Sequence, residues 1–62
     1  MPVVKIELIE GRTVKQKKLM AEKITKIISD IAKVPEDVVD IIFYDIKKEN
    51  FANSGKLFSE IE

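Results

Sequence analysis

The stretch VVKIELIEGRTVKQ, residues 3–16, predicts how the fold begins. Apolar and charged side chains alternate over residues 3–9, so that Val4, Ile6 and Leu8 share one face. This alternation is typical of a β-strand with one face buried and the other in water. We therefore expect the chain to open with a strand.

A helix is expected directly after the strand and a short turn. Thr13 and Gln16 lie three residues apart, which is the spacing of a capping box at a helix start. From residue 14 to about residue 33, apolar side chains recur with the helical period. They are Met20, Ile24, Ile27, Ile28 and Ile31. Pro35 disfavours helical geometry at the residue before it, so the helix is expected to end near residue 32 or 33.

Residues 38–46 predict a second strand. They are rich in Val, Ile, Phe and Tyr and are apolar on both faces except at Asp40 and Asp45, which is typical of a strand buried from both sides. A helix of about 20 residues is roughly 30 Å long and can return along such a strand. The sequence therefore predicts an α/β fold made of one β-α-β unit, with parallel strands and a right-handed crossover.

The tail, residues 47–62, is polar but still carries four large apolar side chains, namely Phe51, Leu57, Phe58 and Ile61. Two strands and one helix cannot cover both faces of a sheet, and a chain of 62 residues without cysteine buries little surface on its own. We expect the tail to be an arm that packs on a neighbouring subunit of a homo-oligomer, although a disordered tail is the alternative. Residues 54–56 are interpreted as a turn, and residues 1–62 as a single domain.

Composition excludes several kinds of chemistry. The chain has no His and no Cys, which rules out imidazole bases, cysteine nucleophiles, Ser-His triads and nearly every structural zinc site. Eleven cationic residues balance eleven acidic ones, so a nucleic-acid-binding module or a metal-binding protein is disfavoured. No apolar run approaches the length of a membrane span, and Lys5 and Glu7 interrupt any secretory signal, so a cytoplasmic location is expected.

Two residues could carry chemistry without histidine. If Met1 is removed, Pro2 presents a secondary amine, and a neutral α-amine is a usable general base near neutral pH. Arg12 is the only arginine of the chain, and its planar fork suits bidentate carboxylate recognition. The simpler interpretations are that Pro2 merely begins an edge strand and that Arg12 is an ordinary surface residue.

The joint spacing of several weak signals resembles a known family. The signals are Met1-Pro2, the run Leu8-Ile9-Glu10-Gly11-Arg12-Thr13, Gln16-Lys17 in the first helical turn, Pro35 after the helix, and Phe51 before a glycine-containing turn. Together they cover essentially the whole chain and resemble the small 4-oxalocrotonate tautomerases.

The resemblance implies a hexamer, a trimer of dimers, in which each dimer forms a four-stranded sheet with helices on one face. It implies an enol–keto tautomerase that acts on 2-hydroxymuconate-like 2-hydroxy-2,4-dienoates and needs no cofactor. By position Pro2 matches the family's general base and acid, and Arg12 matches an arginine that holds a substrate carboxylate. Phe51 matches the apolar wall that keeps the proline neutral.

One position departs from the family. The second active-site arginine of the family aligns at about Asp40, and a carboxylate cannot replace it. Either the alignment shifts and a lysine such as Lys5 or Lys47 takes the place of this arginine, or the substrate differs, or activity on the dicarboxylate is weak. Asp40 as a buried catalytic acid is an alternative, as is a carboxylate paired with Lys or exposed at a subunit boundary. The departure also motivates a second hypothesis, a weak or silent oligomeric binding protein on the same fold.

Overall fold

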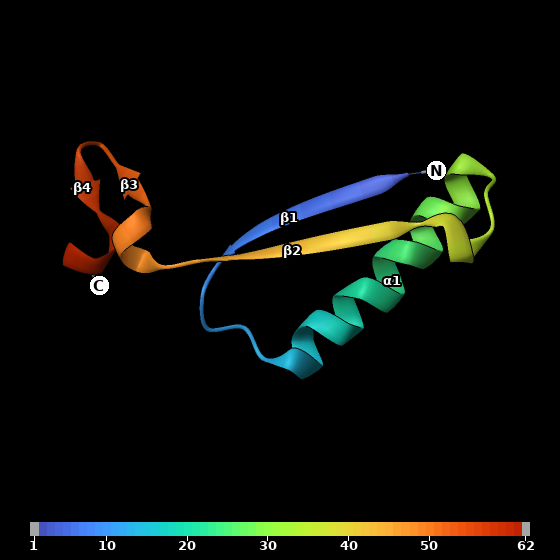
Figure 1. Cartoon of the computed structure of the whole chain (residues 1–62), viewed down its shortest axis with the longest axis horizontal. Helices are drawn as coiled ribbons and strands as arrows, with labels where there is room; N and C mark the ends of the chain where they lie inside the picture. Colours follow the sequence, from blue (N-terminus) through green and yellow to red (C-terminus); the bar gives the residue numbers. More distant parts are fainter. Residues whose placement is uncertain (1, 62) are drawn as a thin grey trace.

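The computed structural model describes residues 2–61 and shows a β-α-β unit followed by a small hairpin (Figure 1). The unit consists of the strand β1 (Val3–Ile9), the helix α1 (Val14–Ala32) and the strand β2 (Asp40–Ile46). The hairpin joins β3 (Ala52–Asn53) to β4 (Lys56–Leu57). Short 3-10 turns complete the chain at Glu36–Val38, Lys48–Asn50 and Phe58–Glu60.

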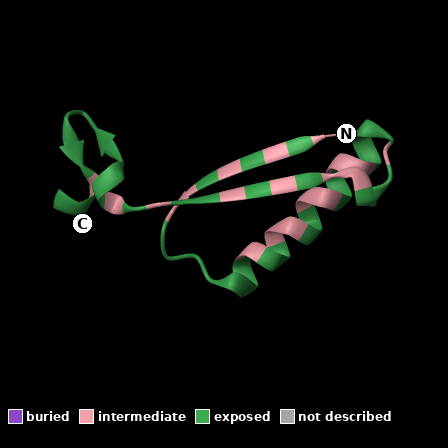
Figure 2. Cartoon of the chain, viewed as in Figure 1, coloured by how far each residue is buried: buried purple, intermediate pink, exposed green. Residues whose placement is uncertain are grey.

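The strands β1 and β2 pair in parallel over their full length, as predicted, with Val3 opposite Asp40 and Ile9 opposite Ile46. The predicted bounds of β1 are confirmed. The strand β2 begins at Asp40 rather than at residue 38, because residues 36–38 form a 3-10 turn after Pro35. Exposed and half-buried residues alternate along both strands, which shows that only one face of the sheet is covered (Figure 2).

The prediction that β2 is buried from both sides is wrong for a single chain. The helix covers the face that carries Ile41 and Phe43, while Ile42 and Tyr44 stay exposed on the open face. Asp45, which interrupts the apolar pattern, lies toward the helix and accepts a hydrogen bond from the Lys17 Nζ at 2.7 Å. The second apolar face of β2 is therefore available to another subunit.

Local signals determine both ends of α1. The Thr13 hydroxyl accepts a hydrogen bond from the Gln16 backbone N–H at 3.0 Å, and the Gln16 side chain accepts one from the Thr13 N–H at 2.9 Å. At the other end Lys33 adopts a left-handed conformation with φ 60°, and the chain then turns toward Pro35. The capping box and the predicted end of the helix are both confirmed.

The inner face of α1 differs from the prediction. Met20, Ile24 and Ile28 are half-buried, whereas Ile27 and Ile31 are 56% and 77% exposed. Two narrow strands cover only part of an apolar stripe on a helix. The remaining part of the stripe, on the flank of α1, faces solvent in a single chain.

The tail folds as a hairpin that projects beyond the ends of β1 and β2 (Figure 1). Asn53 pairs with Lys56, so the loop has two residues, Ser54 and Gly55, with φ values of 53° and 79°. Positive φ at both loop positions is the conformation that two-residue hairpins favour, and glycine adopts it without strain. The predicted turn is confirmed, whereas the two short strands around it were not predicted.

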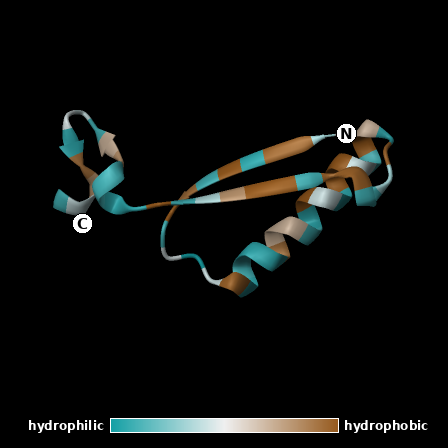
Figure 3. Ribbon diagram, viewed as in Figure 1, coloured by the Kyte–Doolittle hydropathy of each residue, from teal (hydrophilic) through white to brown (hydrophobic). Residues whose placement is uncertain are grey.

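Within residues 2–61 no side chain is fully buried. The radius of gyration is 14.8 Å, against about 11 Å for a compact domain of this length. The accessible surface of 5021 Å² exceeds the roughly 4,100 Å² typical of a folded monomer of 7.1 kDa. Hydrophobic residues lie along both strands (Figure 3), so much of the apolar surface remains uncovered. No helix among the described residues is long and apolar enough to cross a membrane.

Candidate active site

Pro2 lies at the entry to β1 and is half-buried. Its carbonyl oxygen accepts a hydrogen bond from the Asp40 backbone N–H at 3.0 Å, which ties the start of the chain to the start of β2. The predicted base role of Pro2 depends on removal of Met1, a residue outside the described range. The structure thus holds the backbone of Pro2 in place by a bond to the neighbouring strand.

Asp40 is the first residue of β2 and lies opposite Val3 in the parallel register. It is exposed, and its carboxylate forms no ion pair or hydrogen bond within residues 2–61. Of the two lysines considered as substitutes for an arginine, Lys5 shares the open face of the sheet near Asp40. Lys47 follows β2 at the opposite end of the sheet. Exposure does not fit the interpretation of Asp40 as a buried acid within one chain.

Arg12 follows β1 in the loop that leads to the helix. Gly11, just before it, has φ of 122°, a conformation that side-chain-bearing residues rarely adopt, so a glycine is needed for the chain to turn here. The capping box then starts α1 at once. This loop holds Arg12 beside the first turns of the helix.

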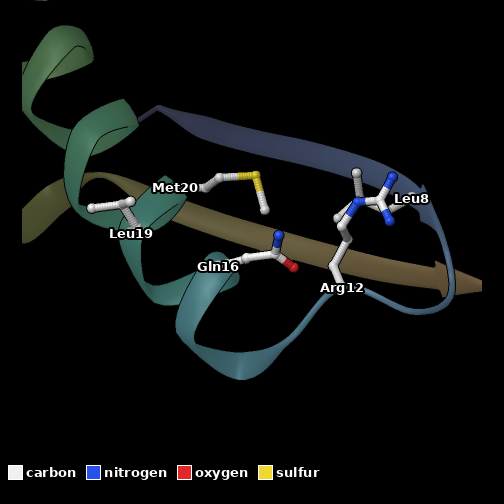
Figure 4. Close-up of a pocket in the computed structure, with 5 residues that line it drawn as sticks. All are labelled: Leu8, Arg12, Gln16, Leu19 and Met20. Atoms are coloured by element: carbon white, nitrogen blue, oxygen red, sulfur yellow. The ribbon is translucent and has the colours of Figure 1, made fainter.

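Arg12 lines a groove of about 260 Å³ between β1 and α1, which we call the Arg12 groove (Figure 4). Its lining residues are Leu8, Arg12, Gln16, Leu19 and Met20. Three of these side chains are apolar, one is a cation and one is a neutral amide. A groove of this kind fits a carboxylate attached to an apolar carbon chain.

Phe51 lies just before β3, at the base of the hairpin. Its ring meets the ring of Phe58 edge to face, with centroids 6.0 Å apart and planes at 81°. The Phe58 N–H also donates a hydrogen bond to the Phe51 carbonyl oxygen at 2.8 Å. Phe51 is still 40% exposed, so part of its ring is free to pack against another surface.

The three predicted site residues do not come together within one chain. Pro2 precedes β1 and Arg12 follows it, and a strand of seven residues spans about 23 Å. Phe51 lies past the far end of β2. A small substrate cannot touch both Pro2 and Arg12 of the same chain. Gln16 was identified from the sequence as a cap and as part of the family resemblance, but its place in the Arg12 groove was not predicted.

Comparisons with known proteins match this architecture. The family model described as "Tautomerase enzyme" matches residues 2–61. A crystal structure of a 4-oxalocrotonate tautomerase homologue superposes with a TM-score of 0.95 at 32% identity, covering 100% of this chain and 98% of the other.

Two curated relatives extend the match. A probable tautomerase of Bacillus cereus is 37% identical over 60 residues, which cover 97% of this chain and 98% of the relative. A 2-hydroxymuconate tautomerase of Bacillus subtilis is 31% identical over 62 residues, which cover both chains completely. The chain therefore belongs to the 4-oxalocrotonate tautomerase family.

Proposed function

We propose that this protein is an enol–keto tautomerase of 2-hydroxymuconate-like 2-hydroxy-2,4-dienoates. The observation that carries the proposal is a proline at the entry to β1 in a chain that matches the tautomerase family over residues 2–61. The activity named for the Bacillus subtilis relative supports this choice of substrate class. The sequence also has no histidine or cysteine that could serve as an alternative base.

In this proposal Pro2 moves the proton, once Met1 has been removed. The neutral secondary amine takes the proton of the enol hydroxyl, and the resulting ammonium returns a proton to a distant carbon of the diene. The double bonds shift and the enol oxygen becomes a carbonyl oxygen, so substrate and product have the same composition. Every step uses one protein group as base and then as acid.

Arg12 holds a carboxylate of the substrate in the Arg12 groove. An arginine paired with a carboxylate forms two parallel charge-assisted hydrogen bonds, and the cation draws electron density toward that end of the conjugated chain. Phe51 supplies an apolar wall near the amine. An apolar wall favours the neutral form of an amine because burial disfavours its charged form.

The active site is assembled from more than one subunit. This part of the proposal rests on the separation of Pro2 from Arg12 within a chain and on the exposed apolar side chains. Exposed apolar side chains lie on the flank of α1, on the open sheet face and on the hairpin. They include Ile27, Ile31, Ile42, Tyr44, Phe51 and Leu57. Exposed apolar side chains of this kind mark interfaces between subunits. The proposed assembly is the one that the family resemblance implies, a homohexamer built as a trimer of dimers.

Asp40 favours a second candidate, a catalytically weak or silent oligomeric binding protein. Its carboxylate is unpaired within residues 2–61 and lies at the same end of the sheet as Pro2, where it would repel a second substrate carboxylate. The tautomerase proposal predicts instead that acidic enols are turned over, and that an enol with a single carboxylate loses less to this repulsion than the diacid.

Two measurements test the proposal. The intact mass of the purified protein shows whether Met1 is present, since a retained Met1 makes the Pro2 nitrogen an amide without a free lone pair. Turnover of 2-hydroxymuconate and of the enol of phenylpyruvate by processed protein then tests the activity. Processed protein that turns over neither substrate would favour the binding protein.

A further inference from the structure

The orientation of the Gln16 side chain follows from the capping box. Its Oε1 accepts a hydrogen bond from the Thr13 backbone N–H at 2.9 Å. A backbone N–H can only donate, so the amide atom that faces it must be the oxygen. The Nε2 atom, with its two N–H donors, therefore points away from the loop and into the Arg12 groove (Figure 4).

The donors of this groove are unused. Neither the Gln16 Nε2 atom nor the Arg12 guanidinium forms a hydrogen bond or an ion pair with any other group in residues 2–61. Leu8, Leu19 and Met20 form the rest of the lining and offer no strong acceptor. Polar contacts beside such apolar walls are stronger than in open water. The side chains of Gln16 and Arg12 are both exposed, so water satisfies their donors in a single chain, and a ligand with acceptor oxygens can replace that water.

We propose that Gln16 is a substrate-binding residue, whose amide nitrogen donates a hydrogen bond to the carboxylate that Arg12 holds. This inference rests on the proposed function. A carboxylate has about four lone-pair sites, and a bidentate arginine uses two of them, so a third donor can be accommodated. Gln16 adds this donor without a second charge, and the capping box holds it in place before the substrate arrives.

Three variants separate substrate binding from helix capping. Gln16→Glu keeps the cap, because glutamate is a standard capping-box residue, but replaces the donor by a negative charge. Gln16→Met removes both the acceptor that caps the Thr13 N–H and the amide donor, and it keeps a side chain of similar volume. Thr13→Ala removes the hydroxyl of the cap but leaves the backbone N–H that orients the Gln16 amide.

The kinetic readout is the steady-state turnover of 2-hydroxymuconate by the processed oligomer. For Gln16→Met we expect kcat/KM to fall about tenfold, mainly through a higher KM. A loss of this size corresponds to one hydrogen bond to a charged group. Gln16→Glu should lower kcat/KM further, since its carboxylate repels the substrate and pairs with Arg12. Its Tm should stay unchanged because the cap is kept. Thr13→Ala should lower Tm but change KM by less than about threefold. Equal KM values for Gln16→Met and Thr13→Ala would overturn the inference.

Binding of adipate, a six-carbon diacid that cannot tautomerise, gives a readout that does not depend on activity. Calorimetry should show weaker adipate binding in both Arg12→Ala and Gln16→Met than in the unmodified protein. Weaker binding in Arg12→Ala alone overturns the role of Gln16 and leaves the proposed function intact. Unchanged binding in Arg12→Ala overturns the carboxylate role of Arg12, and the inference with it.

Discussion

The two ends of the β1–β2 sheet carry opposite chemistry. At the end where the strands begin, Pro2 and Asp40 are joined by a backbone hydrogen bond of 3.0 Å, and the Asp40 side chain is exposed. At the end where they finish, the Arg12 groove presents a cation and an amide between apolar walls. In the proposed function, each end holds one part of the site. The difference teaches that, if Pro2 and Arg12 act as proposed, one end of one subunit must meet the other end of another.

The largest expected effect is at the Pro2 end. Pro2→Ala should lower kcat about a hundredfold or more, since a positioned general base contributes about 10²–10⁴-fold. In the unmodified protein the activity should fall at acid pH, because a protonated amine cannot accept a proton. With no His in the chain, an inflection between about pH 5 and 8 comes from Pro2 or from a carboxylate. A Pro2→Ala enzyme with an unchanged rate and pH profile would show that the proline ring is not required, since this variant still presents an α-amine once Met1 is removed.

The next effect is at the groove end. Arg12→Ala should reduce kcat/KM on every acidic substrate by about tenfold to a hundredfold, since hydrogen bonds to charged groups contribute about 1.5–3 kcal/mol. Because the Arg12 side chain has no partner within residues 2–61, Tm should stay close to that of the unmodified protein. Steady-state kinetics and a thermal scan check both parts. An Arg12→Ala enzyme of full activity would remove this residue from the site.

A smaller, substrate-dependent effect is expected at Asp40. Asp40→Arg should raise kcat/KM for the diacid 2-hydroxymuconate by roughly tenfold but leave the monoacid phenylpyruvate enol nearly unchanged, because only the diacid has a second carboxylate to pair. Asp40→Asn is the matched control that removes the repulsion without adding a cation. Equal changes on both substrates would place Asp40 outside the site.

The smallest effect is expected at Asp45, which lies opposite Leu8 near the groove end of the sheet but does not line the groove. Asp45→Asn breaks the 2.7 Å ion pair with Lys17 that links β2 to α1. Because both side chains are partly in water, the free energy of unfolding should fall by about 1 kcal/mol or less, with kcat/KM unchanged. Chemical denaturation and kinetics check this variant. A large loss of activity would mean that the position of α1 controls the groove.

The sequence predicted those features that short-range signals determine. Alternation gave the bounds of β1, and the Thr13–Gln16 spacing located the start of α1. The exposure of Ile31 was not predicted, because the helical period marks an apolar stripe but not how much of it two strands cover. The open face of β2 agrees with the expectation that two strands and one helix cannot cover both faces of a sheet. Pro2 and Arg12 were selected from the sequence as candidate site residues, and the structure confirms the predicted strand that lies between them and separates them by about 23 Å.

The central claim, that Pro2 of one subunit works with Arg12 of another, has a direct test. Pro2→Ala and Arg12→Ala proteins are each purified, dissociated together and reassembled, with mass spectrometry to verify mixed oligomers. The account predicts that the mixture recovers clear activity on 2-hydroxymuconate, because some mixed sites combine an intact Pro2 with an intact Arg12. Mixed oligomers with no more activity than the two separate variants would contradict it.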